Sequence, residues 1–201
     1  MSYQILRPKE FIYAPVVLGV SVLAMDSFTD TTNVLLENHV AQKGGVWTKQ
    51  LGEMRIDTNK LKETAGSGGS KYTQNLGRAD LVMEIDYTVD TTGYNGFVYR
   101  WVDVNNHWYT WVHNNGQIYL YEKTAGTPTV RANSAPGHSP GDNVHLKLTL
   151  LGDSMTFAIS GDHTGSINYS SSIRNTATIH GIDLNTFSPW DGRLDNYIAT
   201  R

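Results

Sequence analysis

The chain has 201 residues, of which 39% are hydrophobic and 17% are charged, and its formal net charge is −3. This is a globular composition, and the length suits one all-β domain with a substantial core. Lys and Arg form no basic stripe, which argues against nucleic-acid binding. The lack of cysteine excludes disulfides, thiolate zinc sites and cysteine nucleophiles.

The chain opens with an apolar segment. The first ten residues carry Arg7 and Lys9, and residues 11–25 are nearly all apolar, which is the outline of a secretory signal peptide. The segment is too short to span a bilayer as a helix, and its β-branched residues favour a strand. We therefore predict a retained docking arm over residues 1–25, with a removed signal or a disordered leader as the alternative. The residues expected to dock are Phe11, Ile12, Tyr13, Val16, Val17 and Leu18.

From Asp26 onward, short apolar runs alternate with turn residues, and no segment keeps a helical period beyond one possible turn at 34–40. Many short strands without intervening helices predict an all-β, antiparallel two-sheet sandwich. We expect one domain over residues 26–201, with loops at 65–70 and 132–142. The predicted strands are Trp47–Leu51, Glu53–Thr58, Lys60–Glu63, Ala79–Val89, Gly96–Val104, Trp108–His113, Gln117–Lys123, Val144–Leu151, Ser154–Ser160, Gly165–Tyr169 and Leu194–Thr200.

The strand around residues 81–90 has the clearest alternation. Its odd-numbered residues from Leu81 to Val89 are apolar, whereas Glu84, Asp86 and Asp90 fall on the opposite face. One face of this strand is therefore predicted to be buried and the other exposed to water.

The segment 96–112 predicts a hairpin rich in aromatic residues, with its turn at Asp103–Asn106. Such rings either fill a sandwich core or form a platform for a flat ligand such as a sugar. We assign Trp101 and Trp111 to the core more readily than to a platform. Trp108 and Tyr94, near loops, are candidates for sugar stacking. If the turn after Asp90 pairs its two strands symmetrically, Arg100 lies opposite Asp86.

The order of these elements resembles a known family. Asp26-Ser27-Phe28 opens the domain, Trp47 follows, the aromatic hairpin leads to a Gly141-Asp142 turn, and Asp195-Asn196-Tyr197 closes the chain. Together they resemble the concanavalin A-like lectin and glucanase jelly roll in its laminin G-like form, which is common in bacterial and phage surface proteins. The resemblance implies two antiparallel sheets, one of them concave, with the first and last strands adjacent. It also implies carbohydrate binding or adhesion.

The glucanases of this superfamily carry two glutamates on one strand with an aspartate between them. Glu84 and Asp86 match the first two positions, but Thr88 and Val89 stand where the second glutamate belongs. Retaining hydrolysis needs two carboxyl groups about 5–5.5 Å apart, so we interpret the pair as a solvated face or a cross-strand ion pair and expect no enzyme activity. Relatives often hold a structural calcium ion, for which Asp26 and Asp195 are the weak candidates here. No other cofactor or metal is expected, and the seven histidines are scattered.

The resemblance and the apolar arm together favour a non-enzymatic virion structural protein, either a capsid decoration or a tail-associated module. Its arm would contact other virion proteins, and its jelly roll would contact cell-surface glycan or neighbouring subunits in a symmetric, homo-oligomeric assembly. We expect no membrane insertion. The alternative is a secreted, lectin-like carbohydrate-binding protein, or less readily a glucanase. The candidate glycan-binding residues are Tyr94, Arg100, Trp101, Trp108, Trp111, Glu84 and Asp86.

Overall fold

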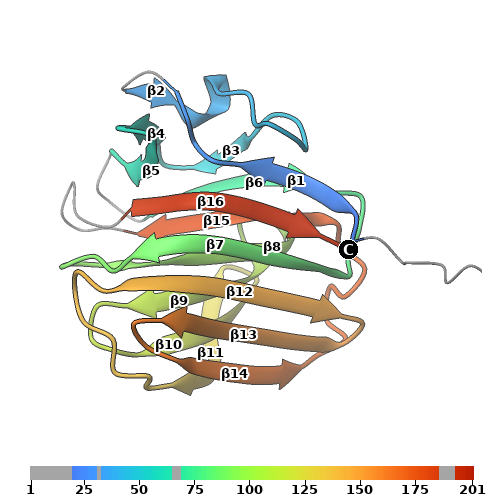
Figure 1. The fold of residues 1–201 in the computed structure, drawn as a ribbon. Coiled ribbons are helices and arrows are strands. Elements are labelled where there is room, and N and C mark those ends of the chain that lie inside the picture. Colours follow the sequence, from blue (N-terminus) through green and yellow to red (C-terminus); the bar gives the residue numbers. More distant parts are fainter. Residues whose placement is uncertain (1–19, 31–32, 65–68, 186–192) are drawn as a thin grey trace, which may run out of the picture.

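The computed structural model describes residues 20–30, 33–64, 69–185 and 193–201. Two antiparallel sheets pack face to face and form a sandwich (Figure 1). The nine-stranded sheet has the order β14-β13-β12-β7-β16-β5-β4-β2, with β1 also paired to β16. Its strands are β1 (Val22–Asp26), β2 (Val34–Leu35), β4 (Met54–Asp57), β5 (Lys60–Glu63), β7 (Leu81–Thr88), β12 (Asn143–Leu151), β13 (Ser154–Gly161), β14 (Gly165–Ser170) and β16 (Arg193–Thr200).

The seven-stranded sheet has the order β11-β10-β9-β8-β15-β6-β3. Every strand predicted from the sequence is present with slightly shifted ends, and the two-sheet sandwich is confirmed. The strands of this second sheet are β3 (Thr48–Leu51), β6 (Ser70–Asn75), β8 (Tyr94–Asp103), β9 (Asn106–His113), β10 (Ile118–Thr124), β11 (Thr127–Ser134) and β15 (Ile179–Asn185).

The inner faces of the two sheets form one continuous hydrophobic core. On β7 the burial alternates as predicted, with Leu81, Met83, Ile85 and Tyr87 buried between the sheets. Because a strand turns successive side chains to opposite faces, the residues between them lie on the outer surface of the nine-stranded sheet. Each sheet thus has one face toward the core and one outer face.

The strands β7 and β8 do not form a hairpin. They belong to different sheets, so the expected pairing of Asp86 with Arg100 is wrong. Arg100 is fully buried, has a φ of 49°, and donates hydrogen bonds to the carbonyl oxygens of Gly152 and Ser171. Its guanidinium therefore connects the segments at Gly152 and Ser171 and is not accessible to a ligand. The β8–β9 hairpin itself is confirmed, with Asp103 paired to Asn106 across the turn.

The start of the described chain belongs to the sandwich. Residues 22–26 pair with β16, and the side chain of Ala24 is buried in the core. The first and last strands are therefore adjacent, as the resemblance implied. Residues 1–19, with the proposed docking residues Phe11 to Leu18, lie outside the described residues.

The segment 34–40 holds the two-residue strand β2 and a single 3-10 turn, η1 (Leu36–Asn38), where the sequence allowed one helical turn. Within the described ranges, no helix has the length and apolar character needed to cross a membrane.

Buried histidines make the stability of this fold depend on pH. Burial lowers the pKa of His180 to about 4 and that of His107 to about 3, both from 6.5. Below pH 6.5 these two histidines are therefore protonated in the unfolded chain but stay neutral in the folded chain. As the pH falls, the free energy of unfolding decreases by up to about 1.4 kcal/mol per pH unit for each histidine.

We expect urea denaturation to show decreasing stability from about pH 7 to about pH 4.5, and the variant His180→Gln to show a shallower decrease. Glutamine retains a donor for the carbonyl oxygen of Arg78, which His180 Nε2 contacts at 2.9 Å. Equal slopes for the two proteins would contradict the assignment of a neutral, buried His180.

Candidate functional site

The outer surface of the seven-stranded sheet carries a dense group of rings, which we name the aromatic face. The sequence predicted that Tyr109 and Trp111 share one side of their strand, and the structure confirms it. The preference for Trp101 and Trp111 as core residues is wrong, because neither belongs to the core cluster between the sheets. Rings from β8, β9 and β10 contact one another in a continuous series. The members of the aromatic face are Tyr94, Trp101, His107, Tyr109, Trp111, His113, Tyr119 and Tyr121.

Trp108 is the exception in this hairpin. It points inward, is 0% exposed and belongs to the core cluster. Its indole Nε1 donates a 3.1 Å hydrogen bond to the carbonyl oxygen of Ile173. The expectation that Trp108 presents an exposed ring near a loop is wrong, because strand β9 begins before it, at Asn106, and fixes the face to which it turns.

The rings stand upright on the sheet. Tyr109 and Tyr121 are paired across adjacent strands, with their centroids 4.8 Å apart and their planes within 8° of parallel. That spacing equals the distance between neighbouring strands, so the rings stack along the sheet and turn their edges outward. A sugar ring would consequently find a flat aromatic surface only where the series of rings is interrupted.

The series of rings is interrupted beside a buried ion pair, formed by Lys71 and Asp183. Asp183 of β15 is 0% exposed, and its carboxylate accepts hydrogen bonds from Lys71 Nζ at 2.8 Å and from Trp111 Nε1 at 3.0 Å. Burial raises the pKa of this carboxyl group, and Lys71 and Trp111 oppose that rise. Asp183 on β15 thus holds the Trp111 indole of β9 in one orientation, although β8 lies between these two strands.

Gly96 makes this contact possible. The register pairs Gly96 with Asp183 on one side and places it opposite Trp111 on the other, so the indole reaches Asp183 over a strand position without a side chain. A methyl group at residue 96 would lie 2.1 Å from the carbonyl oxygen of Thr110, far inside contact distance. Only glycine fits here.

A pocket of about 280 Å³ opens next to this group. His107, Tyr109 and Trp111 line it from the aromatic face, and Lys71 extends over the ring of Tyr109 with its Nζ 5.6 Å from the ring centroid. Loop and edge residues complete the wall: Leu51, Val104, Lys123, Gly126, Pro128 and Asn185. The arrangement combines a flat hydrophobic surface with ammonium and amide donors.

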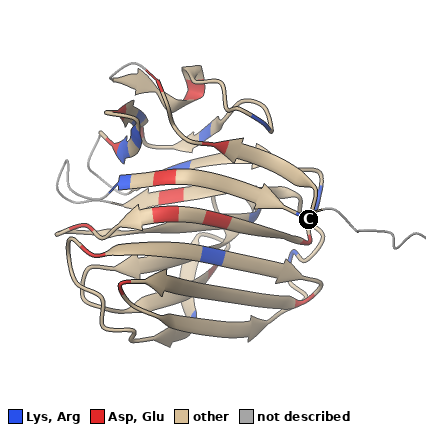
Figure 2. Ribbon diagram, in the orientation of Figure 1, with Lys and Arg blue, Asp and Glu red and all other residues tan. Residues whose placement is uncertain are grey.

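The acidic candidates lie on the other side of the molecule. Glu84 and Asp86 occupy the outer face of β7, in the nine-stranded sheet, among acidic residues of β7 and β16 and a basic residue of β12 (Figure 2). Glu84 Oε1 is 2.8 Å from Lys147 Nζ, and Asp86 contacts His145 Nδ1 at 2.8 Å. The structure therefore separates these two residues from Tyr94 and Trp111 by the whole thickness of the sandwich.

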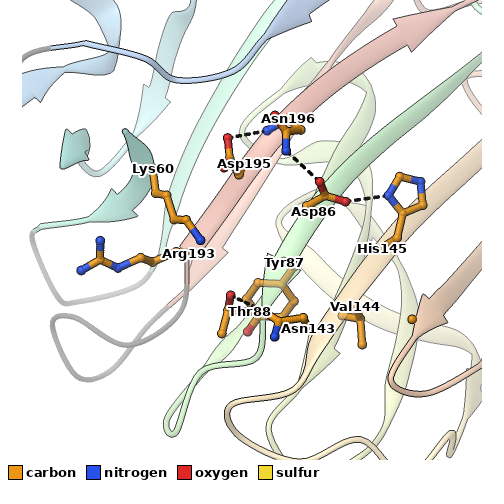
Figure 3. Close-up of a pocket in the computed structure, with 11 residues that line it drawn as sticks. Lys60, Asp86, Tyr87, Thr88, Asn143, Val144, His145, Arg193, Asp195 and Asn196 are labelled. Carbon is orange, nitrogen blue, oxygen red and sulfur yellow. Dashed lines mark hydrogen bonds and ion pairs between the residues drawn. The ribbon is translucent and has the colours of Figure 1, made fainter. Parts of the chain in front are cut away.

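Asp86 is one of the residues that line a second pocket, of about 340 Å³ (Figure 3). Asp195 of β16 is paired with Asp86 in register, and Asn196 Nδ2 donates to Asp86 at 2.9 Å. Burial raises the pKa of Asp195. The proximity of Asp195 to Asp86 could not be predicted from the sequence, because their strands, β16 and β7, are far apart in the chain.

The glucanase pattern remains incomplete in this second pocket. Thr88, where a glutamate would be required, donates a 2.9 Å hydrogen bond to Asn143 Oδ1, and Val89 is buried. Among the described lining residues, Tyr87 is the only Phe, Tyr or Trp, and its ring lies in the core. The described lining thus offers a sugar no Phe, Tyr or Trp ring on which to stack.

Asp26 has a structural role. Its carboxylate accepts hydrogen bonds from Trp47 Nε1 at 2.7 Å and from the Phe28 amide at 2.8 Å, and His39 Nε2 lies 3.0 Å away. This fully buried carboxylate therefore serves as an internal hydrogen-bond acceptor that joins Phe28, His39 and Trp47. Across the described ranges, no three His, Asp or Glu side chains are placed to hold a metal ion.

The sequence matches no protein-family model, and no curated protein matches it. Solved structures do match. The carbohydrate-binding module CBM66 from Bacillus subtilis is 18% identical with a TM-score of 0.56, over 75% of this chain and 91% of that module. The CBM2 module of the evolved Dit protein of Lactobacillus casei BL23 phage J-1 is 12% identical with a TM-score of 0.56, over 90% and 95% of the two chains.

The luminal domain of VIP36, in its metal-free form, is 9% identical with a TM-score of 0.60, over 91% of this chain and 93% of that domain. The fold is that of the concanavalin A-like jelly rolls. The GH43 protein BlXynB from Bacillus licheniformis also matches, with a TM-score of 0.61, but this chain spans only 38% of its length. The chain thus has the β-sandwich of carbohydrate-binding modules and lectins.

We predict that the Lys71–Asp183 pair anchors the aromatic face. Asp183→Asn keeps the side-chain shape but leaves the Lys71 ammonium buried without its counter-charge, so we expect a loss of about 3–5 kcal/mol in the free energy of unfolding. Urea denaturation at neutral pH measures this loss.

Two further variants are the controls. Replacing both partners, with Lys71→Met and Asp183→Leu, removes both charges and should restore most of the stability. Lys147→Met breaks the exposed pair with Glu84 and should cost less than about 1 kcal/mol. A small effect of Asp183→Asn, equal to that of Lys147→Met, would show that the buried pair is not an anchor.

Proposed function

We propose that this protein is a carbohydrate-binding module without catalytic activity and that it binds saccharide in the pocket of the aromatic face. The observation that carries the proposal is the fixed Trp111 indole, held by Asp183 at the edge of an aromatic-lined pocket. The likeness of the whole sandwich to carbohydrate-binding modules and a lectin-like domain supports it.

The pocket has the parts that sugar recognition requires. Apolar faces of a sugar ring pack against aromatic side chains, and sugar hydroxyls exchange hydrogen bonds with polar groups around the ring. Trp111, with Tyr109 packed beside it, provides the first, whereas Lys71, Lys123 and Asn185 provide the second. Because Asp183 fixes Trp111 before a ligand arrives, little side-chain entropy is lost on binding.

Three of the glycan-binding candidates from the sequence belong to the aromatic face, but only one of them lines the pocket. Trp111 lines the pocket, Tyr94 packs on Trp111 with ring centroids 3.9 Å apart, and Trp101 stacks on His107 at 4.4 Å. Tyr94 and Trp101 act on the ligand through the rings that they support. Arg100 and Trp108 are buried elsewhere, and Glu84 and Asp86 belong to the opposite face.

We expect Trp111→Ala to weaken binding to a saccharide ligand by at least about tenfold, because it removes the flat wall of the pocket. A glycan array followed by titration calorimetry of the best ligand measures the effect. Trp111→Phe should retain part of the affinity, since a smaller ring remains.

The matched control is Glu84→Gln, which changes the other sheet and should leave the affinity unchanged. It also tests the hydrolase alternative, since reducing ends released by the natural protein and lost in Glu84→Gln would indicate catalysis at the nine-stranded sheet. Saccharide binding that is lost in Glu84→Gln and kept in Trp111→Ala would refute the proposed site.

We further propose that the module is displayed on a phage particle, with a secreted lectin-like protein as the alternative. The likeness to the phage Dit module over nearly the full length of both chains supports this location. Removal of residues 1–19 leaves β1 intact, so the sandwich should fold and keep its saccharide affinity while failing to join particles. Normal incorporation of this truncated protein would argue against docking through the opening segment.

A further inference from the structure

We infer that the saccharide bound by the aromatic face carries a negative charge, a carboxylate or a phosphate, which Lys123 recognises. This inference rests on the proposed function and specifies its ligand class. It follows from the charges around the pocket, the partners of those charges, and one buried acceptor.

The pocket has an excess of positive charge. Lys71 and Lys123 line it, and no acidic residue does so among the described lining residues. The carboxylate of Asp183 is buried and already accepts hydrogen bonds from Lys71 Nζ and Trp111 Nε1. Among the described lining residues, one ammonium group therefore has no carboxylate partner of its own, and few side-chain oxygen atoms can accept hydrogen bonds from the hydroxyl groups of a neutral sugar.

Lys123 is that uncompensated group. It lies on the outer face of β10, paired in register with His107. Its backbone carbonyl accepts a 2.9 Å hydrogen bond from Arg174 Nη2, but within the described ranges no carboxylate pairs with its side chain. The Arg174 guanidinium forms an ion pair with Glu122 at 3.2 Å, so Arg174 does not compete with Lys123 for the ligand.

His107 is a neutral ring in the wall of the pocket, and it has one buried acceptor atom. Its Nδ1 contacts the carbonyl oxygen of Asp103 at 3.0 Å, so Nδ1 carries the proton and Nε2 retains a lone pair. Among the described atoms Nε2 has no hydrogen-bond partner although it is buried, and leaving such an atom unpaired is costly. Burial, with Lys71 and Lys123 nearby, lowers the pKa of His107 to about 3.

These features select the chemistry of the ligand. The face of one sugar unit would pack on Trp111, next to the edge of Tyr109, and its anionic group would lie beside Lys123, where a charge-assisted hydrogen bond is stronger than a neutral one. A lysine ammonium is a point charge that accepts carboxylate and phosphate alike. The experiment therefore has to distinguish these two sources of negative charge.

The full chain is titrated with three ligands of matched length: a galacturonate trimer, the same trimer with its carboxyl groups reduced to alcohols, and a hexose trimer bearing one phosphate. We expect the natural protein to bind at least one anionic trimer at least about tenfold more tightly than the neutral trimer, with a difference that shrinks as salt is raised. Lys123→Gln should remove this preference and Lys123→Arg should keep it. Lys147→Gln, on the other sheet, is the matched control and should change nothing.

Each outcome decides one question. Equal affinity for charged and neutral trimers, with binding still lost in Trp111→Ala, would overturn the charge inference and leave the proposed function intact. A charge preference that survives in Lys123→Gln would overturn the assignment to Lys123. Failure of the natural protein to bind any saccharide on the array or among the trimers would overturn the proposed function, and this inference with it. A normal thermal unfolding curve for Lys123→Gln shows that its loss of preference is not a loss of fold.

Discussion

The organisation of the seven-stranded sheet depends on one buried carboxylate. Asp183 connects Lys71 on β6 with Trp111 on β9, two strands that are not neighbours of each other. The contact crosses β8 at Gly96, the one position there that no side chain can occupy. A charge without solvent is costly unless it is paired and hydrogen-bonded, so the carboxylate, the ammonium and the indole have to keep their mutual positions. The binding surface that we propose is built around this constraint.

The same constraint explains why the two faces of the sandwich differ. On the nine-stranded sheet, the contacts of Glu84 and Asp86 with Lys147 and His145 are partly exposed, and water screens them. These groups therefore fix no hydrophobic surface. On the aromatic face, rings stacked at the spacing of the strands exclude water and make the electrostatic interactions of Lys71 and Asp183 stronger. A flat polar ligand gains more from the second environment than from the first.

The candidate site could be predicted in part. The alternation along β9 placed Tyr109 and Trp111 on one side and Trp108 on the other, since side-chain direction in a strand is a local property. Lys71 and Asp183 gave no such signal. Both occur in strands of mixed polar composition, β6 and β15, which show no clear strand pattern in the sequence, and their charges are brought together only because the two strands pair side by side between β8 and β3.

The sequence by itself determined the all-β class, the β8–β9 hairpin, the buried face of β7 and the adjacency of the first and last strands, through residue periodicity, turn residues and a family resemblance. The tertiary structure alone decided that β7 and β8 enter different sheets, that Arg100 is buried far from Asp86, and that Asp195 lies next to Asp86. The reason is physical: periodicity reports which face of a strand is apolar, whereas the choice of neighbouring strand depends on packing between segments far apart in the chain.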